Sequence, residues 1–124
     1  MLKTIPFFTL RFQNKDIEKE IFSFYKELHA DAWYVLGKRV SQFEKEYAAY
    51  HSVKECIGVG NGLDALILTL RALHIGKDDE VIVPANSFIA TVLAVSQVGA
   101  RSILVEVDKK SFNITVEGMK GKFM

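Results

Sequence analysis

The sequence predicts an α/β protein built on a parallel sheet. Three short apolar runs, at residues 56–59, 81–83 and 102–107, have the continuous hydrophobicity of strands that are buried on both faces. Helical patterns separate the runs, and parallel strands need such a crossover helix between them. This alternation fixes the class as α/β. Because three strands are few for a sheet of this kind, we expect the sheet to be incomplete.

Two helices are expected before the first strand. Residues 1–15 are predicted to be extended, and a helix is predicted from Asp16, which is a plausible N-cap. Its apolar residues recur at helical spacing on one face: Ile17, Ile21, Phe24 and Leu28. A second helix is predicted over residues 38–50, after Gly37.

The first strand is followed by a glycine-rich turn and a third helix. The turn is Gly60–Gly62, and Gly76 is well placed to end the helix. The residues expected to face inward on this helix are Leu63, Leu66, Ile67, Leu70 and Leu73. Residues 78–80 are acidic, and we interpret them as a solvated turn.

The second strand stops at Pro84, and a fourth helix is expected over residues 88–98. Asn86 or Ser87 can cap it, and Gly99 can close it. This helix is apolar nearly all round, so we expect it to be buried. The whole chain, residues 1–124, is interpreted as one incomplete domain, because no linker or repeat divides it.

Composition excludes several classes of function. The chain is 49% hydrophobic with a net charge of +1, so we expect neither nucleic acid nor a membrane surface as a partner. No signal peptide or membrane-spanning segment is predicted. Cys56 is the one cysteine, which suits a cytoplasmic protein, and we interpret it as an inert thiol of a buried strand. The histidines are dispersed, so no metal site is predicted.

The loop Gly60–Asp64 is a candidate phosphate site. It joins the carboxyl end of a strand to a helix, where free N–H groups and the helix dipole favour an anion. A turn that merely needs glycine explains the loop equally well, and the helix dipole alone explains Asp64. Both interpretations remain open.

Aromatic residues near two loops offer ligand contacts. Phe88 at the start of the fourth helix is either a core residue or a ring that lies on a flat cofactor. Trp33 and Tyr34, between the first two helices, are either substrate contacts or packing residues, and we favour packing.

Two familiar glycine-loop patterns fit poorly. A dinucleotide fingerprint starting at Gly58 and Gly60 needs a third glycine where the chain has Leu63, and the acid expected after the next strand is missing. A methyltransferase-like run exists at Gly58, Gly60 and Gly62, but Cys56 stands where an acid is expected.

Taken in order, the segments resemble the N-terminal part of a DegT-type nucleotide-sugar aminotransferase, a pyridoxal-phosphate (PLP) enzyme of fold type I. The matching segments are Ile5–Phe7, Trp33–Gly37, Phe43–Tyr50, Gly58–Leu66, Gly76–Pro84 and Ser87–Thr91. The resemblance implies that this chain is the first part of a three-layer large domain with a partial parallel sheet.

The resemblance also implies site residues and a reaction. The backbone of Gly62 and Leu63 matches the turn that holds the cofactor phosphate, and Phe88 matches the aromatic that stacks on the pyridine ring. The segments, together with Phe112–Ile114, look most like members that transfer an amino group, usually from glutamate, to C3 of a dTDP-linked 3-keto-6-deoxyhexose. Family members are generally homodimers.

No catalytic residue is expected in this chain. In the family, the Schiff-base lysine and the aspartate that pairs with the pyridine nitrogen lie downstream of the matching segments. The chain is therefore interpreted as an N-terminal fragment that is inactive alone. The alternative is a non-catalytic phosphate- or nucleotide-binding module that uses the turn Gly60–Gly62.

Overall fold

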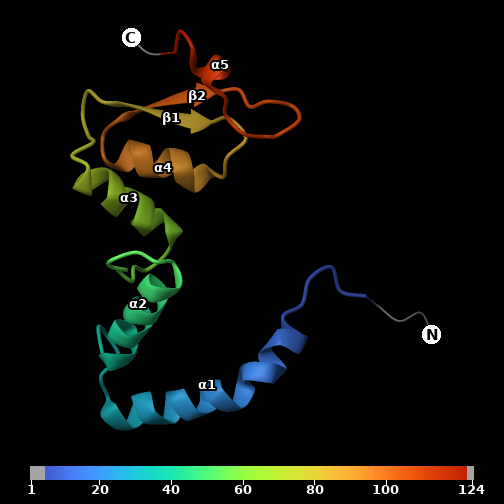
Figure 1. The fold of residues 1–124 in the computed structure, drawn as a ribbon, viewed down its shortest axis with the longest axis vertical. Helices are drawn as coiled ribbons and strands as arrows, with labels where there is room; N and C mark the ends of the chain where they lie inside the picture. Colours follow the sequence, from blue (N-terminus) through green and yellow to red (C-terminus); the bar gives the residue numbers. More distant parts are fainter. Residues whose placement is uncertain (1–4, 123–124) are drawn as a thin grey trace. The chain divides into compact units, whose positions relative to one another are not determined.

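The structure, a computed structural model, describes residues 5–122, apart from the side chains of residues 11–13. Residues 1–4 of the predicted extended stretch therefore lie outside the described part. The chain divides into an N-terminal unit, Met1–Ile57, and a C-terminal unit, Gly58–Met124 (Figure 1). Each unit is described by itself.

The N-terminal unit consists of helices α1 (Arg11–Asp31) and α2 (Lys38–Tyr50). The prediction for α2 is confirmed. The predicted start of α1 at Asp16 is wrong: the helix begins at Arg11, and Leu10 occupies the N-cap position without a side-chain cap. Helical hydrogen bonds extend toward the N-terminus because nothing at residues 11–15 opposes them, whereas Asp16 marks only where apolar periodicity starts.

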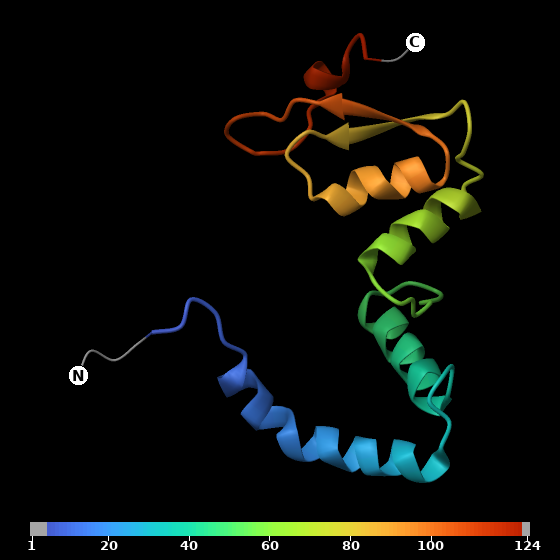
Figure 2. The ribbon, with the colours of Figure 1, turned by 180° about the vertical axis from the view of Figure 1, so that it is seen from behind.

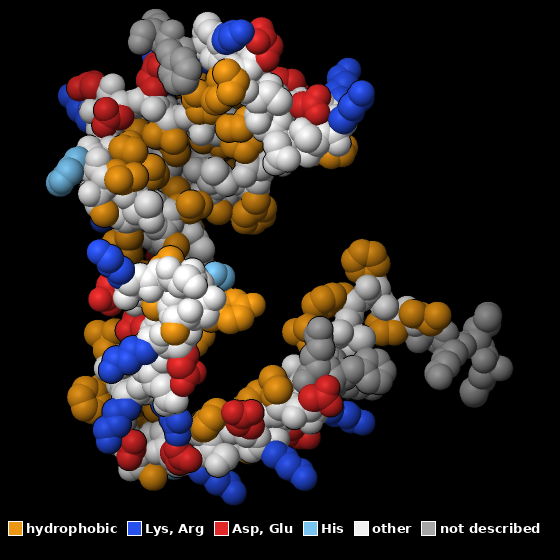
Figure 3. Space-filling view, viewed as in Figure 1, with side chains coloured by type: hydrophobic (Ala, Val, Ile, Leu, Met, Phe, Trp, Pro, Cys, Tyr) orange, Lys and Arg blue, Asp and Glu red, His pale blue; other side chains and the backbone are white. Residues whose placement is uncertain are grey.

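Arg39 links the two helices of this unit. Its guanidinium pairs with the carboxylate of Glu27 and lies 4.4 Å from the centre of the Phe24 ring. By contrast, the predicted apolar face of α1 stays exposed, including Ile17 and Ile21 (Figure 3). Among the described residues of this unit, Ala48 is the one buried hydrophobic residue.

The C-terminal unit contains the predicted parallel strand pair. Strands β1 (Glu80–Pro84) and β2 (Arg101–Val105) pair in parallel, with Val83 opposite Leu104. Helix α4 (Ile89–Gln97) is the crossover between them, and it lies between the sheet and helix α3 (Gly62–Ala72) in both views (Figures 1 and 2). The short helix α5 (Val116–Met119) follows β2.

A small apolar core holds this unit together. The residues with almost no exposed surface are Val83 from β1, Ala94 and Val95 from α4, and Val105 from β2; Ile67 of α3 is also buried. Helix α4 is less buried than predicted, since Ile89 and Leu93 remain exposed on the sides that neither the sheet nor α3 covers.

The predicted strand at residues 56–59 is wrong. This segment is not a strand in the structure, and the described sheet consists of β1 and β2 alone. A strand exists only through hydrogen bonds to a neighbouring strand, and neither β1 nor β2 pairs with this segment. Accordingly, Ile57 is 79% exposed, and Cys56 is half-buried rather than the buried core thiol that we expected.

Glycine and aspartate shape the ends of the helices. Gly99 follows α4 with a φ of +85°, as expected for a residue that closes a helix. Helix α3 ends at Ala72, four residues before Gly76. The N–H of Gly76 instead donates to Oδ2 of Asp79 (2.8 Å), which shapes the acidic turn before β1.

Candidate functional site

The first turn of α3 carries a reciprocal cap. Asn61 is the N-cap residue: its side-chain oxygen accepts a hydrogen bond from the Asp64 N–H (3.0 Å), and its amide nitrogen donates to Oδ2 of Asp64 (2.9 Å). Two side chains therefore hold each other and the helix start in one geometry. This role was not predicted from the sequence, although Asn61 stands three residues before Asp64, which is the spacing of a capping pair.

The cap leaves two backbone donors free at the helix start. The N–H groups of Asp64 and Ala65 bond to Asn61, whereas no hydrogen bond is found for those of Gly62 and Leu63 within the described residues. These are the first two helical positions, where N–H groups have no intrahelical acceptor. The predicted phosphate-binding residues thus present two donors at the positive end of a helix dipole.

Space around these donors is open. An ideal Cβ built on Gly62 meets no atom within 4 Å, so a ligand can approach its backbone closely. The Leu63 side chain is apolar and half-buried. The group that Leu63 can offer to a polar ligand is therefore its backbone N–H. At Gly60, a Cβ would lie 2.7 Å from the Asp64 carboxylate, so a side chain there would disturb the reciprocal cap.

Phe88 lies at the other helix start of the unit. It is the N-cap residue of α4, with extended backbone angles, and its side chain is 78% exposed. The ring of Phe88 is therefore not part of the core that the described residues form. The predicted caps Asn86 and Ser87 are wrong, because Phe88 itself makes the transition into the helix and the Ser87 hydroxyl bonds instead to that of Thr91 (2.7 Å).

The starts of α3 and α4 lie at the same end of the C-terminal unit. Both views show this end to be the one at which β1 and β2 finish (Figures 1 and 2). Ligands of open parallel sheets bind beyond this edge. The fold therefore brings the free amides of Gly62 and Leu63 to the same side of the unit as the exposed ring of Phe88.

A loop after β2 borders this end. The side-chain amide of Asn86 donates to the carbonyl of Phe112 (3.3 Å), which joins the β1–α4 loop to the segment after β2. Asp108 organises that segment: its Oδ1 accepts from the Ser111 N–H (2.8 Å), the Ser111 hydroxyl (3.0 Å) and the Lys110 N–H (3.1 Å). These donors, led by the Ser111 N–H, hold the pKa of the Asp108 carboxyl below its ordinary value.

Other site chemistries have little support in the described residues. No group of three or more His, Cys, Asp or Glu side chains gathers into a possible metal site among them. None of the described helices is both long and apolar enough to cross a lipid bilayer.

The parallel strand pair, its crossover helix and the open start of α3 can be compared with known folds. Solved structures similar to this chain are PLP-dependent aminotransferases of fold type I, so the predicted fold class is confirmed. Residues 15–122 match the DegT/DnrJ/EryC1/StrS aminotransferase family. The chain belongs to this family, as the resemblance predicted.

Individual relatives agree with this assignment. The chain is 49% identical over 110 residues to dTDP-3-amino-3,6-dideoxy-alpha-D-galactopyranose transaminase of Aneurinibacillus thermoaerophilus, covering 89% of this chain and 30% of that protein. It is similar to the structure of DesV from S. venezuelae (TM-score 0.91, 34% identity, 97% of this chain and 32% of that one).

A third similar protein was solved with a cofactor. The structure of NtdA from Bacillus subtilis with bound cofactor PMP has a TM-score of 0.92 and 29% identity, and the match covers 100% of this chain and 29% of that one. The chain thus spans about 30% of the length of the relatives that it matches.

The reciprocal cap predicts the effect of changing Asn61. Asn61→Ala removes the acceptor of the Asp64 N–H, and we expect the opening free energy of the first turn of α3 to fall by about 1 kcal/mol. Hydrogen exchange of the amides at residues 64–66 measures this change. Asn61→Ser is the matched control, since its hydroxyl keeps the acceptor; equal loss in both variants would contradict the capping role.

The hydrogen bonds to Asp108 predict a pH dependence. Because the folded-state pKa is lowered, the carboxylate stabilises its loop above the unfolded-state pKa, and this contribution is lost as the pH falls through the folded-state pKa. We expect Ser111→Ala to raise the Asp108 pKa part of the way back, since the substitution removes the hydroxyl donor while the backbone N–H donors of residues 109–111 remain. Carboxyl ¹³C NMR titration measures it, with the exposed Ser96→Ala as control; an unchanged pKa in Ser111→Ala would count against the assignment.

Proposed function

We propose that this chain is the N-terminal portion of a PLP-dependent sugar aminotransferase. The whole enzyme transfers an amino group, from glutamate, to a nucleotide-linked keto-deoxyhexose, and C3 of a dTDP-3-keto-6-deoxyhexose is the proposed acceptor. Membership of the family supports the reaction class, and the name of the Aneurinibacillus relative supports the dTDP-linked sugar. The observation that carries the proposal is the pair of free amides at the start of α3, at the same end of the unit as an exposed aromatic residue at the start of α4.

The residues at this end of the C-terminal unit fit the cofactor. The N–H groups of Gly62 and Leu63 would donate to its phosphate, and the missing side chain of Gly62 leaves room for that group. Phe88 has an uncovered ring at a helix start, which suits stacking on a flat heterocycle. When bound, PLP supplies the electron sink for amino-group transfer.

Asn61 and Asp64 are proposed to maintain the geometry of the phosphate-binding turn at Gly62 and Leu63. The Asp64 carboxylate would repel a phosphate if it swung forward, but the Asn61 amide holds it at 2.9 Å. The Asn61 side chain also accepts the hydrogen bond of the Asp64 N–H. The backbone N–H groups that remain for a ligand are therefore those of Gly62 and Leu63. Asn61 is thus proposed as a positioning residue for the phosphate-binding turn.

The rest of the catalytic machinery is proposed to lie outside this chain. We propose that the lysine that binds the cofactor covalently and the aspartate that pairs with its pyridine nitrogen belong to other segments of the whole enzyme, since the chain covers 30% of the length of the Aneurinibacillus relative. We therefore propose that residues 1–124 form part of one larger domain and do not complete transamination alone. The whole protein is proposed to be a cytoplasmic homodimer.

A covalent-trapping experiment tests whether the chain is inactive alone. The chain is incubated with PLP, reduced with borohydride and mapped by mass spectrometry, with glutamate and the keto sugar supplied in a parallel assay. We expect no amino sugar and only sparse pyridoxyl labelling spread over surface lysines. Stoichiometric labelling of one lysine, with turnover, would overturn the inactivity of the chain.

The role of Phe88 predicts a ring-dependent affinity. We expect the chain to bind PLP more tightly than inorganic phosphate, and Phe88→Ala to lose about two- to tenfold of the PLP affinity, since an aromatic contact contributes about 0.5–1.5 kcal/mol. Equilibrium dialysis measures both ligands. The exposed Phe7→Ala is the control. PLP and phosphate binding equally, with no effect of Phe88→Ala, would favour the non-catalytic phosphate-binding module instead.

A further inference from the structure

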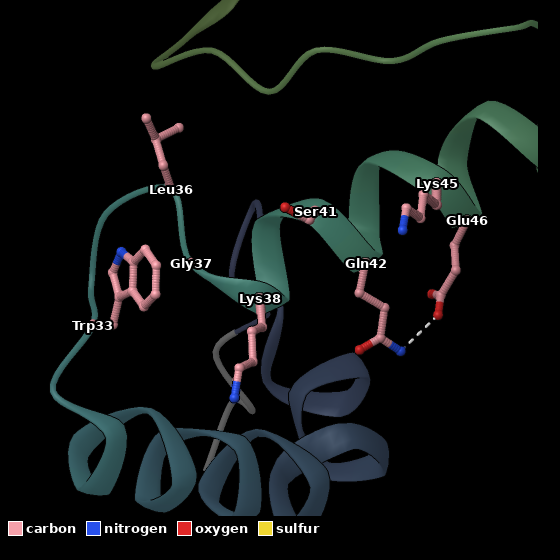
Figure 4. A pocket seen from close by; sticks show the side chains of 8 residues that line it. All are labelled: Trp33, Leu36, Gly37, Lys38, Ser41, Gln42, Lys45 and Glu46. Atoms are coloured by element: carbon pink, nitrogen blue, oxygen red, sulfur yellow. Dashed lines mark hydrogen bonds between the residues drawn. The ribbon is translucent and has the colours of Figure 1, made fainter.

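Trp33 and Phe88 are exposed aromatic residues close to helix starts, but different contacts hold their rings. The Trp33 ring is 60% exposed and is not part of a core that the described residues form. Its Nε1 donates a hydrogen bond to the carbonyl of Val35 (2.7 Å), which fixes the indole beside the start of α2 (Figure 4). Phe88 has no polar side-chain atom and is 78% exposed. The direction of its ring therefore depends on where its backbone is placed.

The start of α4 has no cap of its own among the described residues. Phe88 is the N-cap residue, and no side-chain cap hydrogen bond is found there. Backbone bonds hold the first half of the loop before it. The Ser87 N–H donates to the Pro84 carbonyl (3.1 Å), which closes a turn, and the Ala85 N–H donates to the Val105 carbonyl at the end of β2 (2.9 Å). The loop is thus tied to the sheet just before Asn86.

The side chain of Asn86 adds a link to a distant segment. Its amide nitrogen donates to the carbonyl of Phe112 (3.3 Å), 26 positions later in the chain. Both views show the β1–α4 loop next to the segment that follows β2 (Figures 1 and 2). One residue, Ser87, separates Asn86 from Phe88. Because so short a stretch has little freedom when both of its ends are held, this bond restrains the backbone of Phe88.

The carbonyl that accepts this bond is itself held in place. The Phe112 N–H donates to the Asp108 carbonyl (2.8 Å), and the Asp108 N–H donates to the Asn113 carbonyl (3.0 Å). Phe112 has a φ of +56°, a region that bulky side chains rarely adopt, yet its ring is 68% exposed. Burial of the ring therefore does not offset the strain. What the conformation does provide is the set of backbone bonds of Phe112, and the bond from Asn86 joins that set to the β1–α4 loop.

We propose that Asn86 is a positioning residue for the cofactor ring. It ties the β1–α4 loop to the segment after β2 and thereby fixes the direction in which Phe88 presents its ring. This inference rests on the proposed function, because the contact of Phe88 with the cofactor is part of that proposal. Asn86 needs no contact of its own with the cofactor, so its effect on affinity passes through Phe88. A ring that is already held in one orientation loses less conformational freedom on binding than a mobile ring does.

A variant of similar size without a donor tests the link in the absence of any cofactor. In Asn86→Leu, we expect the heteronuclear ¹⁵N NOE of residues 87–89 to fall, since the loop loses its side-chain connection. Asn86→Ala should give the same result. Asn14→Ala, an exposed asparagine of the other unit, is the matched control and should leave these values unchanged. Amide exchange of the buried residues Ala94 and Val95 shows whether α4 is intact in each variant.

A double-mutant cycle shows whether the effect on affinity passes through Phe88. Pyridoxamine phosphate (PMP) is the probe, because it has the cofactor ring and phosphate but no aldehyde that reacts with surface lysines. We expect Asn86→Leu to lose about two- to tenfold of the PMP affinity in equilibrium dialysis, and no more than Phe88→Ala loses. In the Phe88→Ala background, Asn86→Leu should cost no further affinity, since residues that act through one contact are not additive. Losses that add in full would overturn the positioning role.

The two measurements separate this inference from the proposed function. An unchanged NOE at residues 87–89 in Asn86→Leu, or a PMP affinity that depends on Phe88 but not on Asn86, would contradict the positioning role alone. A lower NOE in Asn86→Leu, with no PMP binding by the unaltered chain, would confirm the link between the two segments. That result would overturn the cofactor site and with it the cofactor role of Asn86.

Discussion

A parallel pair of strands requires a crossover, and this requirement organises the C-terminal unit. Helix α4 must carry the chain from the end of β1 back to the start of β2, so it begins at the edge where the strands finish. Its inward residues Ala94 and Val95 pack with Val83 and Val105 into the core. The position of Phe88, at the first turn of the crossover, follows from this geometry.

The backbone N–H groups that lack an acceptor at the start of α3 determine which ligand can bind at this end of the sheet. Every helix start leaves several N–H groups without intrahelical acceptors, and Asn61 satisfies those of Asp64 and Ala65 only. What remains is a pair of donors at Gly62 and Leu63, next to open space. Backbone N–H groups at a helix start can bind an anion without any charged side chain, and the proposed phosphate site of this loop depends on that property.

The N-terminal unit depends more on contacts of a charged side chain than on hydrophobic burial. Arg39 ties α1 to α2 through Glu27 and the ring of Phe24, whereas the long apolar face of α1 contributes little to burial within the unit. The loop before α2 fixes an aromatic ring in an exposed position. Residues 15–122 match the aminotransferase family, and the chain spans about 30% of the length of the relatives that it matches.

The sequence by itself determined the features that depend on neighbours along the chain. Helical spacing located α2 and α3, continuous apolar runs located β1 and β2, and the ordered segments identified the family. The roles of Gly62, Leu63 and Phe88 toward a cofactor stay predictions. Only the tertiary structure decided that residues 56–59 are not a strand, that Asn61 and Asp64 cap each other, and that Phe88 and Trp33 are exposed. Strand pairing and burial depend on residues distant in sequence, and periodicity within one segment carries no information about whether such partners are present.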